Sequence, residues 1–172
     1  MQKSSGFTLM ELLVTIAIIA VVSAIAVPNF MSWLPKYRLG NASREVLSIL
    51  QKTRVRAVKD NLLCAVQFNV GNESYTAISD DGAGTPNPLP PAGDGIPDGR
   101  GNGIFEATET VIAAGSLLAG IDIVSTIGLT GGRVVFDTQG VASETGDIIL
   151  RNDRGDSRTI VIELAGSSRI QN

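Results

Sequence analysis

The sequence predicts an α+β protein in which one long N-terminal helix packs on a head of antiparallel β-sheet. Residues 12–34 form a stretch of 23 residues with no charged side chain, and residues 39–57 carry apolar side chains at helical spacing. From residue 62 onward, short apolar runs alternate with Gly, Asn, Asp and Pro. A chain of 172 residues is the size of one domain, so we expect a single head with the helix as its appendage.

The first element is the apolar stretch Leu12–Leu34. As a helix it rises about 1.5 Å per residue and is long enough to cross a hydrocarbon core of roughly 30 Å. An ordinary secretory signal is the alternative, because Lys3 supplies a positive start and Ala24-Ile25-Ala26 could be a cleavage site. That alternative predicts a soluble exported domain, cut after Ala26.

Glu11, at the front of this stretch, distinguishes the two interpretations. An unpaired carboxylate in lipid costs on the order of a few kcal/mol. An ordinary signal peptide or membrane anchor does not require an acidic residue at this position. Gly6-Phe7-Thr8-Leu9-Met10-Glu11 directly follows a short polar leader, and counting from Phe7, Glu11 is the fifth residue and Pro28 the twenty-second. These residues resemble the leader and helix of type IV pilins and of the pseudopilins of type II secretion systems.

The resemblance implies a role for each of these residues. A prepilin peptidase would remove residues 1–6 by cutting between Gly6 and Phe7, and would methylate the new amine of Phe7. Glu11 would pair with the positive N-terminus of a neighbouring subunit, an arrangement that fixes register more than it adds stability. Pro28 lacks an N–H and would kink or locally melt the helix.

The same resemblance implies the domain organisation and the location. Residues 7–35 would be a transmembrane and assembly helix, single-pass in a bacterial inner membrane. Residues 36–172 would be a periplasmic, pilin-like head that joins a periplasmic or cell-surface filament. The implied partners are other pilin or pseudopilin subunits, prepilin peptidase and the inner membrane, with exported proteins as further candidates.

The next element is an amphipathic helix over residues 36–60. Its apolar positions recur at steps of three and four, which gives one buried face, and Asp60-Asn61 is a plausible stop. From Phe7 to Asp60 the whole helix would be roughly 80 Å long. Its second half is basic, and we interpret most of these cations as a solvated helix face. The apolar positions are Leu39, Ala42, Val46, Ile49, Leu50, Thr53 and Ala57.

The β-rich region spans residues 62–172. Residues 62–70 and 74–79 predict a hairpin around Gly71-Asn72. Further strands are expected at residues 111–113, 121–127, 133–137, 147–151 and 158–164. The segments 44–68, 134–140 and 158–169 resemble the GspH/FimT branch of the pilin-like proteins. The single cysteine, Cys64, excludes an intrachain disulfide, which favours a minor pilin or pseudopilin over a major pilin.

An acidic, Gly- and Pro-rich segment covers residues 80–109. Within residues 98–109 the oxygen-bearing side chains fall at several positions of an EF-hand loop, although Arg100 occupies one ligand position. We therefore expect either a calcium site or an acidic loop without metal. The candidate calcium ligands are Asp98, Asn102, Glu106 and Glu109.

Catalysis is not expected, because the chain has no histidine and no zinc-type or phosphate-binding motif. The resemblance implies a structural subunit, first of all a minor pseudopilin of a type II secretion system. The alternative is a minor type IV pilin that acts in pilus assembly or DNA uptake. Some FimT-like proteins bind DNA through a basic C-terminal motif, of which this chain has only Arg169, and the acidic head disfavours binding to phosphates.

Overall fold

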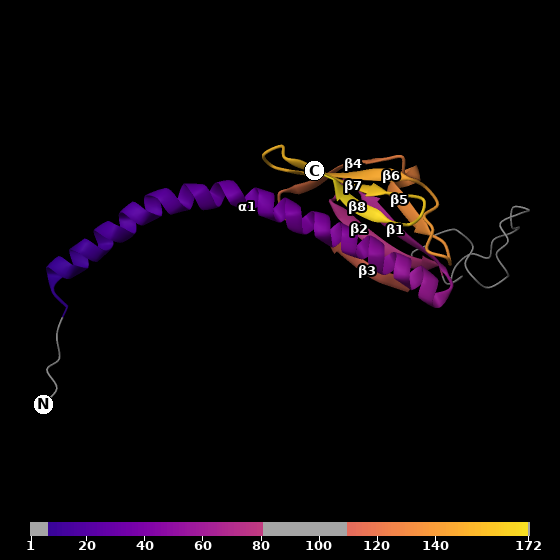
Figure 1. The fold of residues 1–172 in the computed structure, drawn as a ribbon, viewed down its shortest axis with the longest axis horizontal. Coiled ribbons are helices and arrows are strands. Elements are labelled where there is room, and N and C mark those ends of the chain that lie inside the picture. The colour runs from indigo at the N-terminus through magenta and orange to yellow at the C-terminus, as the bar shows by residue number, and fades with distance from the viewer. Residues whose placement is uncertain (1–6, 81–109, 172) are drawn as a thin grey trace, which may run out of the picture.

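The computed structural model describes residues 7–80 and 110–171. One helix, α1 (Leu9–Asp60, 52 residues), projects far beyond a head of β-sheet that covers only its C-terminal half (Figure 1). The predicted α+β class is confirmed. The helix continues through Pro28 and Pro35 and curves smoothly, so the local melting predicted at Pro28 does not occur in the single chain. Each proline removes one backbone hydrogen bond, and the helix persists on both sides of it.

The stop predicted for the helix is also confirmed. Asn61 adopts a left-handed conformation (φ 57°, ψ 44°), and its N–H donates to the carbonyl of Ala57. Asparagine tolerates this conformation better than most residues. Leu62 N–H donates to the same carbonyl at 3.2 Å, after which the chain enters the first strand.

The described residues of the head form two four-stranded antiparallel sheets (Figure 1). The first has the order β3-β2-β1-β5 and the second the order β4-β6-β7-β8. The β1–β2 hairpin that the sequence predicted is confirmed, with Val66 opposite Ala77. The strands are β1 (Leu63–Asn69), β2 (Ser74–Asp80), β3 (Thr110–Ser116), β4 (Ile121–Ile127), β5 (Arg133–Phe136), β6 (Gly146–Asn152), β7 (Ser157–Ile162) and β8 (Ser168–Gln171), with a 3₁₀ turn, η1 (Thr130–Gly132), before β5.

One strand prediction was wrong in extent, and one strand was missed. The last strand was expected to run from residue 158 to 164, but β7 ends at Ile162 and the chain turns there. Gly166 sits in this turn with φ +72°, and its N–H donates to the Glu163 carbonyl at 2.8 Å. The chain then returns as β8, which the sequence analysis missed, and pairs Ile170 with Ile160.

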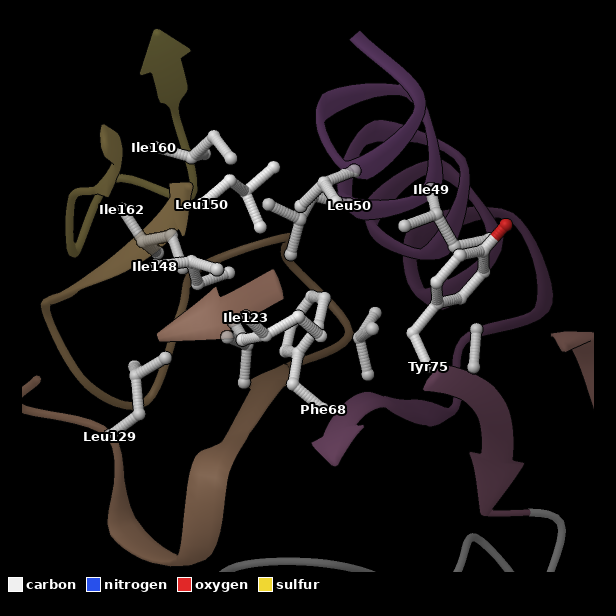
Figure 2. Close-up of a cluster of buried hydrophobic side chains, with 14 of the residues drawn as sticks. Ile49, Leu50, Phe68, Tyr75, Ile123, Leu129, Ile148, Leu150, Ile160 and Ile162 are labelled. Atoms are coloured by element: carbon white, nitrogen blue, oxygen red, sulfur yellow. The ribbon is translucent and has the colours of Figure 1, made fainter. Parts of the chain in front are cut away.

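The core lies between the stem half of α1 and the two sheets. All seven apolar positions predicted for the amphipathic face are buried. Leu50 points toward Leu150 and Ile160 of the second sheet, whereas Ile49 lies beside Tyr75 of the first (Figure 2). The helix therefore holds both sheets together, and Cys64 is buried among the same side chains, as its apolar run predicted.

Candidate assembly helix and its contacts with the head

The helix begins at Leu9, two residues after Phe7, which the sequence analysis placed at the mature N-terminus. Thr8 caps it, since its Oγ1 accepts the Glu11 N–H at 3.2 Å and its carbonyl accepts the Leu12 N–H at 3.2 Å. Phe7 is exposed. Gly6 and the rest of the leader lie outside the described residues. Cleavage before Phe7 would therefore leave a short tail of two residues ahead of a capped helix.

Glu11 lies in the first helical turn, where the helix dipole favours a negative charge. Its side chain is exposed, and neither of the salt bridges between described residues involves it. The carboxylate is thus positioned at the free end of the helix, far from the head. The structure gives its location but does not test its predicted pairing with another subunit.

The part of α1 that precedes Met31 is exposed along its whole length. It is long and apolar enough to cross a membrane, and none of that window is buried within the protein. Large apolar side chains project along its length, and Ile19 and Ile25, for example, are 63% and 71% exposed. A soluble monomer rarely exposes so much contiguous apolar surface. Lipid or other helices are the environments that suit it.

The two prolines of α1 have different surroundings. Pro28 withdraws the helical donor of the Ala24 carbonyl inside the apolar half. Pro35 does the same to the Met31 carbonyl, but there Arg154 Nη2 donates instead at 3.1 Å, while Nη1 donates to the Ser32 carbonyl at 3.3 Å. Arg154 belongs to the β6–β7 turn, so the head contacts α1 at its second proline.

A second arginine joins the stem to two turns of the head. Arg54 Nε donates to the Gly140 carbonyl at 2.8 Å, and Nη2 donates to the Ala165 carbonyl at 3.0 Å. The sequence analysis grouped Arg54 with the solvated cations of the stem. Its position between Leu50 and Ala57 on the buried face, at helical spacing, was the signal that could have identified it. The other six stem cations are exposed as predicted: Lys36, Arg38, Arg44, Lys52, Arg56 and Lys59.

Two ionisable side chains of the head, Tyr75 and Cys64, are buried. Tyr75 donates its hydroxyl to Glu45 Oε1 at 2.7 Å, and burial together with this carboxylate raises the pKa of Tyr75 to about 12. Burial also raises the pKa of the Cys64 thiol, which disfavours the reactive thiolate. Within residues 7–80 and 110–171, no three His, Cys, Asp or Glu side chains gather as a metal site would require.

The remaining candidate site residues fall in two places. Asp98, Asn102, Glu106 and Glu109, the candidate calcium ligands, lie outside the described residues. Arg169 is in β8, exposed, with its Nη1 3.2 Å from Glu163 Oε1. This neighbouring acid offsets the one positive charge of the candidate DNA-binding motif.

Comparison with family models gives two matches that together cover most of the chain. Residues 1–27 match the prokaryotic N-terminal methylation motif, and residues 42–166 match the type II transport protein GspH. The first match contains Gly6, Phe7 and Glu11, and the second contains most of the stem and nearly all of the head. Comparison with curated protein sequences gives no match.

Solved structures share the fold at low sequence identity. The type IV minor pilin FimU of Pseudomonas aeruginosa is 12% identical with a TM-score of 0.53, over 80% of this chain and 90% of FimU. The minor pseudopilin EpsH of the type 2 secretion system of Vibrio cholerae is 10% identical with a TM-score of 0.52, over 78% of this chain and 96% of EpsH. At such identities the likeness concerns the fold alone.

Proposed function

The chain belongs to the family of the type II transport protein GspH, and we propose that it is a minor pseudopilin of a type II secretion system. The observation that carries this proposal is the helix that leaves the head. Its apolar half stays uncovered by the rest of the chain, and the methylation motif lies at its front. The apolar half of such a helix can contact lipid while the subunit is in the membrane, and can contact the helices of neighbouring subunits after assembly.

We propose that processing prepares the helix for this exchange. Prepilin peptidase hydrolyses the peptide bond between Gly6 and Phe7 and then transfers a methyl group from a sulfonium methyl donor to the Phe7 amine, both on the cytoplasmic side. The helix stays in the inner membrane as a single span and the head lies in the periplasm. The support for this is the position of Phe7 directly before the Thr8 cap, together with the match of residues 1–27 to the methylation motif.

Glu11 would then act during assembly. Two opposite charges in a low-dielectric bundle attract strongly, and an unpaired one is costly there. A new subunit whose Glu11 meets the methylated amine of a neighbour therefore enters in one register.

A minor type IV pilin is the second candidate, because FimU shares the fold. Deletion of the gene for this protein distinguishes the two proposals. Loss of extracellular secretion of folded proteins with normal pili supports the pseudopilin, and loss of pili or of DNA uptake with normal secretion supports the pilin. An ordinary exported soluble domain fits less well, since it would leave the match of residues 1–27 to the methylation motif without a use.

Glu11→Gln tests the assembly proposal. We expect the variant to be cleaved and membrane-bound like the wild type, but recovered in filament fractions at least about tenfold less, since an unpaired amine in the bundle costs more than 1.4 kcal/mol. Thr15→Val, a change of a neutral side chain one helical turn away, is the control and should assemble normally. Normal filament recovery of Glu11→Gln would show that Glu11 has no part in assembly.

A further inference from the structure

The turn between β6 and β7 reaches back along α1 toward its apolar half (Figure 1). Arg154, in this turn, donates to the carbonyls of Met31 and Ser32. The uncharged stretch of the helix ends at Leu34, so the guanidinium contacts the helix inside that stretch. Met31 lies three residues before Leu34, which is about 4.5 Å along the axis.

The contact between Arg154 and α1 fixes where the β6–β7 turn lies along the helix. If the uncharged stretch spans the hydrocarbon core, Met31 and Ser32 lie at its edge, where phospholipid phosphates begin. A guanidinium is costly in the hydrocarbon core but favourable among headgroups. The β6–β7 turn must therefore rest at the membrane surface and not above it in solvent.

Arg154 retains donors for a ligand at this place. A guanidinium has five N–H groups, and the two helix carbonyls use two of them. The side chain is exposed, which leaves the others accessible. Phosphate oxygens are the acceptors that a guanidinium binds best at a surface.

Further cations follow within the next three turns of the helix, about 8 to 14 Å beyond Met31 along its axis. Lys36 and Arg38 follow the span on α1, and Arg38 Nη1 lies 3.4 Å from the Ala119 carbonyl. Arg158 of β7 packs against Gly40, where its guanidinium is the nearest side chain. We call Lys36, Arg38, Arg154 and Arg158 the membrane-exit collar.

Two acids lie in the β6–β7 turn itself. Asp153 packs against Gly120, and Asp156 Oδ2 accepts a hydrogen bond from Asn152 Nδ2 at 3.0 Å. These two carboxylates reduce the positive charge of the four cations but leave it in excess. The collar therefore has the sign that an anionic headgroup layer attracts.

Aromatic side chains mark the same level on another face of the helix. Trp33 stacks on Tyr37 with ring centroids 4.8 Å apart, and Phe30 lies 6.2 Å from Trp33. At 3.6 residues per turn, these positions lie roughly 80–160° around α1 from Met31 and Arg38, on a different face of the helix. Trp and Tyr are enriched at membrane interfaces, which independently places the bilayer boundary here.

We propose that the membrane-exit collar binds the phosphates of acidic phospholipids, and so holds the head against the bilayer before assembly. The proposal rests on the proposed membrane anchorage of α1. It adds a ligand class and an orientation that anchorage alone does not provide. Removal of the subunit from the membrane into a filament would break these lipid contacts.

Lipid selection by the full chain tests this proposal. The protein is reconstituted in bilayer discs of equal phosphatidylcholine and phosphatidylglycerol, released in mild detergent, and the lipids that remain bound are counted by native mass spectrometry. Wild type should retain phosphatidylglycerol in excess. Arg154→Gln and Lys36→Gln should each lower this excess by about fivefold, the effect of one cation near an anionic surface, and Arg154→Lys should lower it less.

Arg169→Gln is the matched control, because it removes an exposed arginine near the turns held by Arg54, about 30 Å farther along the helix. It should retain phosphatidylglycerol like wild type. Unchanged hydrogen exchange in β6 shows that each variant is folded. Equal retention of the two lipids by wild type, or a phosphatidylglycerol excess unchanged in Arg154→Gln and Lys36→Gln, would overturn the proposal. A chain that does not enter the discs at all would instead contradict the anchorage.

Discussion

Arg54 and Arg154 both join the helix to the head through main-chain carbonyls. Arg54 bridges the turns that contain Gly140 and Ala165, and Arg154 supplies a donor to the carbonyl that Pro35 leaves without one. The only cysteine is buried and free. These arginine contacts provide cross-links between distant segments in a protein that has no intrachain disulfide.

Replacement of Arg54 by Gln should destabilise the head. The shorter amide cannot reach both carbonyls, and loss of hydrogen bonds from a charged donor costs about 2 kcal/mol. Lys52→Gln, an exposed change two residues away, should stay within about 0.5 kcal/mol of wild type. Urea unfolding of the full chain in detergent measures both, and equal stabilities for the two variants would show that the Arg54 contacts contribute nothing.

Tyr75 should make the head sensitive to alkali. Its pKa is raised from 10.0 to about 12 in the folded chain, so the folded state disfavours the phenolate. This contribution to stability is complete below the unfolded value of 10.0 and is lost as the pH rises toward 12. Wild type should therefore lose more stability than Tyr75→Phe between these pH values. Cys64, whose pKa is also raised, is present in both proteins and does not affect their difference. Parallel pH profiles of melting temperature would contradict the assignment.

At the scale of elements, the sequence pattern predicted the features that depend on residues close together in the chain. The buried face of the stem, the stop at Asn61 and the β1–β2 hairpin all follow from spacing and turn chemistry that lie within a few residues. The strand β8 and the Arg154 contact do not, because each depends on segments far apart in the chain. Ser168–Gln171 is short and polar, and it becomes a strand only because β7 offers its edge.

Pro35 and Arg154 of the β6–β7 turn should contribute to stability in a coupled way. In Pro35→Ala the new backbone N–H can donate to the Met31 carbonyl. This carbonyl then has a hydrogen-bond donor even when Arg154 is replaced. A double-mutant cycle of Pro35→Ala with Arg154→Gln should give a coupling of about 1 kcal/mol, the worth of one hydrogen bond. The measurement is the unfolding free energy of the four chains in detergent.

Pro28→Ala is the control for this cycle. It restores the donor to Ala24, which lies seven residues before Met31 and away from the head. Its coupling with Arg154→Gln should be close to zero. Equal coupling for the two prolines would mean that Arg154 does not act through the freed carbonyl.

At the scale of the whole molecule, the protein is a folded head carried on a helix that the head covers only in part. The sequence predicted this division, since the charge-free stretch and the amphipathic stretch meet near Lys36. It could not predict that the head bends back to contact the helix before that point. The candidate calcium ligands lie outside the described residues, so that prediction remains untested.

The central claim is that the helix is a processed and retained membrane and assembly segment. The measurement that tests it most directly is the N-terminal sequence and intact mass of the mature protein, purified from membranes of a cell that makes it. We predict a chain that begins at N-methylated Phe7 and still contains the whole of α1. A chain that begins at Val27, or an uncut chain in a cell with active prepilin peptidase, would contradict the claim.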